Sequence, residues 1–283
     1  MLVYDRKTGA VIEEQEYGET AIRFLYDTVP GRVLLKLIAV RPYFSKLRAR
    51  YQKSPISKRN ILPFIQKYGI DMTEYEDTYV CFNDFFTRRR AIPRTAAARE
   101  LTAPADAKLL AYQISRDLRI QVKHDCYTLE EILKEPLDLS PFENGYCLVF
   151  RLSVSDCHRY YFMDDGEYEG RYRVKGLLHT VRPISAGYRV FCSNQREVSL
   201  LNMRNLGCVI QVEVGALLVG CVKNHDTEKF SKLEEKGYFE YGGSTILVLV
   251  GSQVKIDEDI RENSRLGLET KVEIGEKIGE IIA

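Results

Sequence analysis

The stretch EEKGYFEYGGSTILVLV, residues 234–250, joins a charged aromatic segment to two glycines and then to a largely β-branched apolar run. The run that begins at Ser244 predicts a strand, because β-branched residues favour sheets. Glycines before a strand relax the backbone and often mark a bulge. They can equally leave the peptide bond before Ser244 open to attack by the Ser244 hydroxyl. This stretch alone does not decide between the two.

Similar apolar runs recur through the second two thirds of the chain. Short runs broken by turns are typical of packed sheets or a barrel-like sandwich. We therefore predict an α+β protein with a β-rich, barrel-sandwich-like core over residues 96–283. Within it, TLEEIL (128–133) predicts a short helix capped by Thr128. The runs expected to form strands are GYCLVFRLSV (145–154), YRVFCS (188–193), CVIQVEVGALLVGCV (208–222) and STILVLVG (244–251).

Residues 1–95 differ from the rest of the chain in composition and are expected to be helical and basic. From Thr28 to Ile70 there is no Asp or Glu, while ten Lys and Arg residues alternate with apolar ones. Such a basic amphipathic stretch can lie in the headgroup layer of an anionic membrane. It can equally be a solvated helix pair packed on the main domain. Nucleic-acid binding is not expected, since no nucleic-acid motif accompanies the charge.

The composition is that of an ordinary globular protein. The 283 residues are 45% hydrophobic and 29% charged, with a net charge of +1, so bulk charge does not make the chain a polyanion binder. The seven cysteines form no CxxC pair, which disfavours a disulfide framework or a zinc site. The polar N-terminus is unlike a secretory signal, and VLLKLIAV (33–40) is too short to span a bilayer.

One of the four histidines, His158, stands near a residue that could assist it. Asp156 precedes His158 by two positions, so on a strand both side chains would share a face, and the carboxylate could orient the imidazole. A plain surface pair at a strand end has the same spacing. His179 follows another polar turn, and Asp106, after Pro104, could simply be a turn residue.

Several common catalytic patterns are missing from the sequence. Ser244 is not in a GxSxG motif, and there is no GxxxxGK[ST] or HExxH. No cluster of histidines and cysteines has metal-ligand spacing, so no metal site is expected.

Five motifs in order are similar to those of the phosphatidylserine decarboxylase family. They are FNDFFTRRR (82–90), PADAKL (104–109), SDCHRYYF (155–162), VEVGALLVG (212–220) and EKGYFEYGGST (235–245). The resemblance runs from about residue 80 to the C-terminus, and it is to the bacterial type whose processing motif is GGST. The C-terminal segment 267–283 resembles strands of biotinyl carrier domains and is expected to be scaffold.

The resemblance implies a proenzyme that cleaves itself between Gly243 and Ser244. The products would be a β chain of residues 1–243 and an α chain from Ser244, whose serine becomes a covalent pyruvoyl cofactor. It also implies decarboxylation of phosphatidylserine to phosphatidylethanolamine and carbon dioxide. By the same resemblance, Asp106 matches the aspartate of the self-cleavage triad, and Asp156 and His158 match the family's D-x-H stretch.

One position departs from the family pattern. The resemblance implies a second histidine three residues after His158 as the base of the triad, but the sequence has Tyr161 there. Tyrosine, with a pKa near 10, is a poor base at neutral pH. We hypothesise that His179 replaces it, which requires Tyr161 and His179 to face each other on neighbouring strands. His158 serving both steps, or poor processing, are the alternatives.

These inferences favour a peripheral enzyme on the cytoplasmic face of a bacterial inner membrane, acting on phosphatidylserine at an anionic surface. The family resemblance suggests a homodimer of αβ units. One rival is a non-catalytic lipid-binding homologue that lost processing with the second histidine. Another is a pyruvoyl decarboxylase acting on a soluble amino acid, which the basic N-terminal part disfavours.

Overall fold

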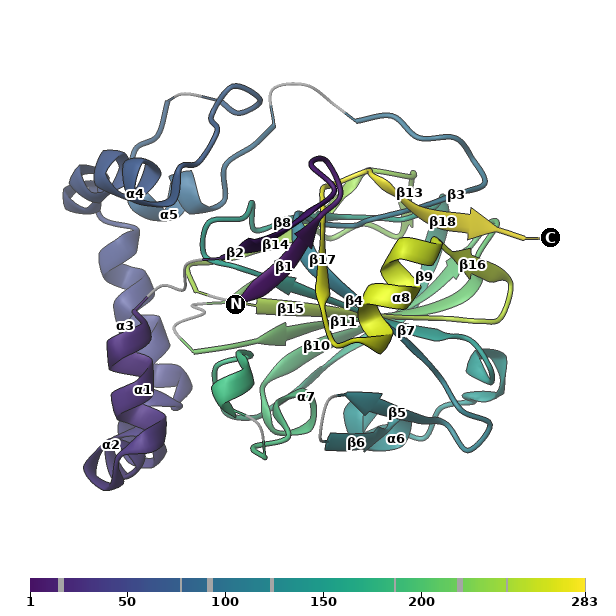
Figure 1. The fold of residues 1–283 in the computed structure, drawn as a ribbon, viewed down its shortest axis with the longest axis horizontal. Helices are drawn as coiled ribbons and strands as arrows, with labels where there is room; N and C mark the ends of the chain where they lie inside the picture. Colours follow the sequence, from purple (N-terminus) through teal and green to yellow (C-terminus); the bar gives the residue numbers. More distant parts are fainter. Residues whose placement is uncertain are drawn as a thin grey trace.

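The computed structural model describes residues 1–14, 18–76, 78–90, 94–122, 125–185, 187–217, 221–242 and 244–282. Its centre is a ten-stranded mixed sheet in the order β13-β9-β10-β11-β15-β7-β4-β17-β1-β2 (Figure 1). Neighbouring strands are antiparallel except β1 and β17, which are parallel. The strands are β1 (Leu2–Asp5), β2 (Ala10–Glu13), β4 (Ala107–Gln113), β7 (Tyr146–Leu152), β9 (Gly166–Val174), β10 (Arg196–Met203), β11 (Gly207–Gly215), β13 (Lys229–Phe230), β15 (Ser244–Val250) and β17 (Glu269–Val272).

The α+β class is confirmed, but the barrel-like part of the expectation is wrong. The sheet is open, and its two edges are β13 and β2. The physical reason is that β1 and β2 extend one end of the sheet instead of letting it close on itself. Apolar periodicity along single strands does not carry that information.

The position of β15 in the sheet explains why its sequence is a largely apolar run. It lies between β11 and β7, and all seven of its residues are buried. Ile246, Val248 and Val250 pack into one hydrophobic core, while Leu247 and Leu249 pack into a second core on the other face. A strand covered on both faces needs apolar residues at every position instead of alternation.

Three small sheets and several short helices flank the main sheet. The small sheets have the orders β12-β14-β8, β16-β18-β3 and β5-β6. Helix α6 (Leu129–Leu133) confirms the predicted capping box, with Thr128 and Glu131 bonded to each other's backbone N–H. The strands are β12 (Val222–Asn224), β14 (Glu235–Phe239), β8 (Arg159–Tyr161), β16 (Val254–Ile256), β18 (Lys277–Ile281), β3 (Glu100–Thr102), β5 (Arg119–Val122) and β6 (Asp125–Thr128); the helices are η3 (Ser140–Phe142), η4 (Pro183–Ser185), α7 (Val190–Ser193) and α8 (Glu258–Arg265).

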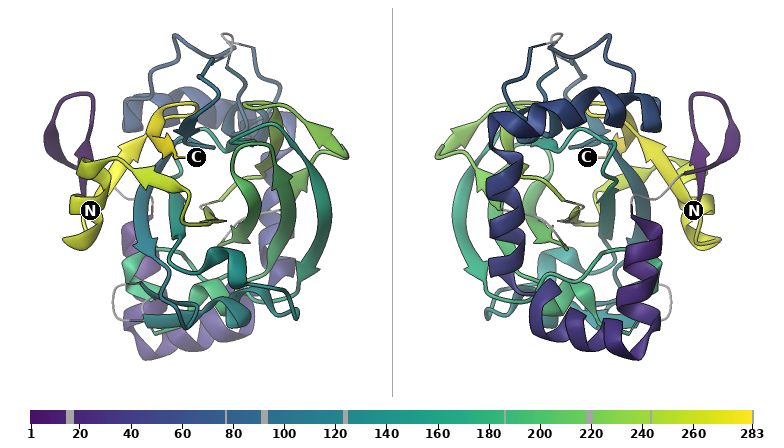
Figure 2. Two further views of the ribbon diagram at one scale, coloured as in Figure 1. Left: turned by 90° about the vertical axis from the view of Figure 1, so that its right-hand side faces the viewer. Right: turned by 90° about the vertical axis from the view of Figure 1, so that its left-hand side faces the viewer.

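The N-terminal helices lie together at one side of the sheet (Figure 1). The right-hand view of Figure 2 shows them arranged around the ends of the central strands. Among the described residues, no helix is both long and apolar enough to cross a membrane. The elements are α1 (Glu19–Asp27), α2 (Val29–Leu34), the π-helical turn η1 (Leu35–Ala39), α3 (Pro42–Gln52), the 3₁₀ turn η2 (Pro55–Asn60), α4 (Ile61–Tyr68) and α5 (Phe82–Phe86).

Two local expectations are wrong. Residues 2–13 are strands of the main sheet and not helix, because β1 pairs with the distant β17. Segment 188–193, expected as a strand, contains helix α7, and Val190 and Phe191 are buried there. Short apolar runs do not distinguish a strand from one buried helical turn.

Candidate active site

Ser244 is the first residue of β15, opposite Gly215 of β11 and Leu152 of β7. It is fully buried. Its Oγ has no hydrogen-bond partner among the described residues. A buried hydroxyl without a partner is costly, which makes Ser244 a candidate functional residue.

The loop before Ser244 is held from outside the sheet. The amide of Tyr241 donates to Asn83 Oδ1 (3.1 Å), so the helix of the FNDFF motif fixes the loop. Gly242 has φ 136°, a conformation that favours glycine. Gly243, the other residue of the expected cleavage bond, lies outside the described residues. The predicted use of glycine before Ser244 is therefore visible at Gly242.

His158 is fully buried beside this loop. Its ring packs on Phe86, with the two ring centroids 3.9 Å apart. Nδ1 lies 3.0 Å from the carbonyl oxygen of Asp156. A carbonyl only accepts, so in the neutral ring Nδ1 carries the proton and Nε2 keeps its lone pair. Nε2 has no partner among the described residues.

Burial lowers the pKa of His158 to about 3, although the nearby backbone of Asp156 and Gly242 opposes the shift. The imidazole is therefore neutral at pH 7 and lies against Gly242, two residues before Ser244. The lone pair on Nε2 is available to accept a proton, and the low pKa makes this imidazole a weaker base than a free histidine.

Asp156 orients His158 differently from the expected way. The pair lies in a turn between β7 and β8 and not on one strand face. The carboxylate of Asp156 accepts from Lys108 Nζ (2.8 and 2.9 Å) and from the amide of Ser153 (2.7 Å). The shared-face expectation is thus wrong, and the backbone carbonyl of Asp156, not its side chain, fixes the tautomer.

A buried ion network surrounds this turn. Lys108 and Arg151 face each other on β4 and β7. Glu14 contacts both, through Lys108 Nζ (2.6 Å) and Arg151 Nη2 (3.1 Å), and Glu269 pairs with Arg151 (2.6 Å). Burial opposes ionisation of Glu14, but the two cations outweigh it and lower the pKa of Glu14 to about 2. Burial likewise disfavours the charge of Lys108, but Asp156 and Glu14 raise its pKa.

Asp106 belongs to a second buried group. Its carboxylate accepts from Arg90 Nη2 (2.9 Å), Tyr75 Oη (2.9 Å) and the amide of Ile274 (2.9 Å). Burial would lower the pKa of Arg90, but the charge of Asp106 raises it above its ordinary value. The Asp106 carboxylate thus accepts from a guanidinium, a phenol and a backbone amide.

His179 lies in a different environment. Its Nδ1 is 3.2 Å from the Tyr26 hydroxyl of α1, and its amide donates to Asn194 Oδ1 (3.0 Å). Its ring packs on Tyr188, with centroids 4.5 Å apart. Burial lowers the pKa of His179. His179 and Asp106 therefore share no described hydrogen-bond partner.

The geometry required for His179 to replace the missing histidine is not found. Tyr161 ends β8, whose described neighbour is β14, and His179 lies outside the strands. The amide of Tyr161 donates to the carbonyl of Pro104 (2.9 Å), two residues before Asp106. Position 161 thus lies beside the loop of Asp106, but burial raises the pKa of Tyr161 further above neutrality. Tyr161 is not a base at neutral pH.

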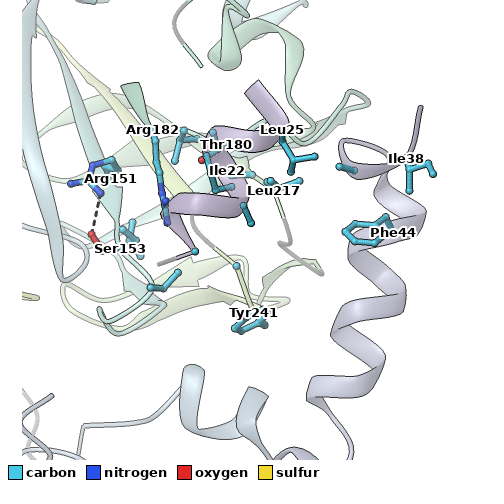
Figure 3. Close-up of a pocket in the computed structure, with 18 of the residues that line it drawn as sticks. Ile22, Leu25, Ile38, Phe44, Arg151, Ser153, Thr180, Arg182, Leu217 and Tyr241 are labelled. Carbon is cyan, nitrogen blue, oxygen red and sulfur yellow. Dashed lines mark hydrogen bonds between the residues drawn. The ribbon is translucent and has the colours of Figure 1, made fainter. Parts of the chain in front are cut away.

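An apolar cavity of about 320 Å³ opens between the N-terminal helices and the loop before Ser244. Figure 3 shows Ile22, Leu25, Ile38 and Phe44 on its helical side and Tyr241 on the opposite side. Arg151 and Ser153 lie at its polar end, joined by a hydrogen bond (3.0 Å). Gly242 also lines the cavity. A mostly apolar cavity with a few polar groups at one end suits an amphiphilic ligand.

Sequence reasoning missed the charged residues that organise this region. Lys108 and Arg151 are lone cations inside otherwise apolar strands, at AKLLA (107–111) and LVFRL (148–152). A single charge in a buried run is a usable signal, because such a charge must be paired. Glu14 carried no such signal. Over the described ranges, no group of three or more His, Cys, Asp or Glu side chains is placed to hold a metal ion.

The profile described as "Phosphatidylserine decarboxylase" matches residues 82–280. "Phosphatidylserine decarboxylase proenzyme 2" of Clostridium acetobutylicum is 46% identical over 284 residues, covering 98% of both chains. The chain belongs to the phosphatidylserine decarboxylase family. "Phosphatidylserine decarboxylase proenzyme" of Clostridium perfringens is 39% identical, with 98% of both chains covered. The protein of the same name from Desulfitobacterium hafniense is 37% identical, with 98% of this chain and 97% of its own length covered.

Membership of the phosphatidylserine decarboxylase family makes this chain an enzyme, a decarboxylase. The match begins at Phe82, the first residue of α5, and ends within β18. It therefore includes Ser244, His158, Asp156, Asp106 and His179. The similarity to the curated relatives also covers the N-terminal helices, since it spans nearly the full chain.

Proposed function

We propose that this chain is a phosphatidylserine decarboxylase made as a proenzyme, which cleaves itself between Gly243 and Ser244 and then acts with a pyruvoyl group derived from Ser244. The observation that carries the proposal is the buried Ser244 hydroxyl without a partner, next to a loop that His158 also touches.

In the cleavage step, the Ser244 hydroxyl adds to the carbonyl carbon of Gly243. The carbon–nitrogen bond breaks, the hydroxyl proton passes to the nitrogen, and an ester replaces the amide. A base then takes the α-proton of Ser244, and the carboxylate of Gly243 leaves. The resulting dehydroalanine is hydrolysed with loss of ammonia, which yields the pyruvoyl end and a β chain with an ordinary carboxyl terminus.

We assign the base to Nε2 of His158. It is neutral, it has a lone pair and it lies by Gly242. His179 remains a second candidate, although its described contacts are with Tyr26 and Asn194. Asp106 keeps the triad role that the family resemblance implies, and its loop is bonded at Pro104 to the amide of Tyr161, three residues after His158.

The pyruvoyl group supplies an electron sink for loss of carbon dioxide. Gly242, two residues before Ser244, lines the apolar cavity, so a ligand bound in that cavity lies close in sequence to the position of the pyruvoyl group. The apolar wall of the cavity holds the glycerol and acyl part of the lipid with its head toward Gly242. A proton from solvent replaces carbon dioxide on the substrate carbon, and His158 Nε2, which carries no proton in the resting neutral ring, can take it up and pass it on.

Membrane contact is part of the proposal. The N-terminal helices expose a set of apolar side chains and carry ten cations without an acidic residue between Thr28 and Ile70. Apolar side chains that enter the headgroup layer and cations that attract anionic lipid act together. We name this set the helical docking surface: Phe24, Val29, Val33, Leu34, Leu37, Ile38, Tyr43, Phe44 and Leu47.

The test is decarboxylation itself. Purified wild-type protein is mixed with vesicles that contain phosphatidylserine, and phosphatidylethanolamine is measured by mass spectrometry. We expect turnover by the wild type and none by Ser244→Ala. Vesicle binding without any product from the wild type would instead support the non-catalytic rival.

A further inference from the structure

Arg88 is a buried cation that the proposed chemistry does not use. It follows α5 and is 2% exposed. Its guanidinium lies over the rings of Tyr75 and Phe85, with the central carbon 4.7 and 5.2 Å from their centroids. Nη2 donates to the carbonyl of Ser155 (2.7 Å). Nε and Nη1 have no acceptor among the described residues.

Arg88 lines a polar cavity of about 460 Å³, which is distinct from the apolar one. Four other lining cations have carboxylate partners: Lys7 with Glu273, Arg90 with Asp106 and Glu74, Lys108 with Asp156 and Glu14, and Lys271 with Asp5. Within the described chain, Arg88 has no carboxylate within 4 Å, as is also true of the exposed Lys67. A buried charge without a counter-charge is unfavourable. The wall of this cavity therefore presents a cation that lacks an anion.

The position of Arg88 connects this cavity to the active site. The carbonyl of Ser155 accepts from the Arg88 guanidinium. The thiol of Cys157 donates to the backbone carbonyl of Arg88 (3.3 Å). Ser155 and Cys157 flank Asp156, which lies two residues before His158. Phe86, two residues before Arg88, packs on the His158 ring. Segment 86–88 thus touches the imidazole on one side and offers three unpartnered N–H groups on the other.

We propose that the polar cavity is an oxyanion subsite in which Nε and Nη1 of Arg88 bind a phosphate or carboxylate group. Guanidinium donors recognise such oxygens strongly, and stacking on Tyr75 and Phe85 holds the donors in place. The oxyanion comes either from the headgroup of the lipid substrate or from free phosphate. The headgroup source rests on the proposed function, whereas anion binding by itself does not.

The first experiment measures binding without catalysis. Ser244→Ala protein, which keeps the chain in one piece, is heated with glycerophosphoserine, with inorganic phosphate, or with sodium chloride at matched ionic strength. We expect one of the two phosphates to raise the melting temperature. We also expect the rise to be absent when Arg88→Gln is added and kept when the exposed neighbour Arg89 is changed, Arg89→Gln. A rise at lower glycerophosphoserine concentration identifies the headgroup, and an equal or stronger response to inorganic phosphate identifies free phosphate.

The second experiment measures turnover of a short-chain phosphatidylserine in the processed enzyme. For a headgroup subsite, Arg88→Gln raises KM at least about tenfold, the equivalent of one charge-assisted contact, and changes kcat less. Arg88→Lys keeps the charge, so its KM should lie between those of the wild type and Arg88→Gln. It serves as the test variant if Arg88→Gln does not fold. A melting temperature that neither phosphate raises, or a rise that survives removal of Arg88, overturns the subsite. Arg88-dependent anion binding in a wild type that releases no carbon dioxide would overturn the proposed function and leave the subsite standing.

Discussion

At the scale of single residues, the site depends on two buried atoms without described partners, Ser244 Oγ and His158 Nε2. The tautomer of His158 is set by a backbone carbonyl, so the lone pair is on Nε2. The choice of base for self-cleavage is then a choice between two histidines in unlike surroundings. His158 touches the loop at Gly242, and His179 bonds to α1 through Tyr26.

Replacing each histidine separately distinguishes these roles. We expect His158→Ala to slow self-cleavage at least about a hundredfold, the usual contribution of a general base. We expect His179→Ala to leave the cleavage rate within about threefold. Gel densitometry of the two product chains after expression and timed incubation measures both. Rapid cleavage by His158→Ala together with arrest of His179→Ala would restore His179 as the base.

The low pKa of His158 also predicts a dependence of stability on pH. The folded-state pKa of about 3 lies below the unfolded value near 6.5, so the unfolded state binds the proton first. This contribution to the free energy of unfolding is complete above pH 6.5 and is lost as the pH falls toward 3. Between pH 7 and pH 5 the loss is about 2 kcal/mol.

Urea unfolding in the Ser244→Ala background checks this value. The drop between pH 7 and pH 5 should be about 2 kcal/mol smaller when His158→Asn is added. Equal drops in the two proteins would show that His158 is not held neutral by burial.

At the scale of elements, β14, the strand before the loop at Gly242, is tied to the main sheet by a buried ion pair. Lys236 of β14 and Glu213 of β11 are both fully buried, with Nζ 2.8 Å from Oε1. Asn224 of β12 contacts both side chains. Because β11 also pairs with β15, this cluster sets the position of β14 relative to Ser244.

Removing one partner of this pair leaves a buried charge behind. We expect Lys236→Met to lower the free energy of unfolding by about 3 kcal/mol, and a second change, Glu213→Gln, to recover part of it. Lys229→Met is the control, because that lysine is exposed and its Nζ lies as far as 4.0 Å from the carboxylate of Glu167. Denaturant titration of the four proteins gives the values, and a neutral Lys236→Met would mean that the pair does not hold β14.

The elements also show what sequence predicts. β15 and the helix capped by Thr128 were predictable, because continuous apolar residues and a capping box are local signals. β1 was not, since its partner β17 lies more than 260 residues away. The site residues came from the order of motifs, but the ion network of Lys108, Glu14 and Arg151 depends on contacts between distant strands that no local pattern encodes.

At the scale of the whole molecule, the helices and the apolar cavity lie at the same side of the sheet (Figures 1 and 3). Leu34, Ile38 and Phe44 belong both to the helical docking surface and to the lining of the cavity. In the proposed membrane-bound arrangement, a lipid that enters past these helices would meet the loop at Gly242 without crossing the sheet.

Charges placed on this surface should weaken membrane binding. Leu37 is 63% exposed and Tyr43 is 77% exposed. We expect the double change Leu37→Glu and Tyr43→Glu to reduce binding to phosphatidylserine vesicles at least about tenfold, since each apolar side chain in the interface contributes roughly 1–2 kcal/mol. Leu266→Glu is the control, because Leu266 is 81% exposed beyond the end of α8. Vesicle co-sedimentation measures binding, and equal losses for both variants would contradict an oriented docking surface.

The most direct measurement of the central claim is intact mass spectrometry of the purified wild type beside Ser244→Ala. The account predicts two chains in the wild type, residues 1–243 and 244–283, and one chain in the variant. The small chain should be lighter than a chain with a free serine amine by the mass of one ammonia, which marks a pyruvoyl end. A folded wild type that stays a single chain, with the same mass as expected from its sequence, would contradict the claim that Ser244 is a cleavage site and the source of the cofactor.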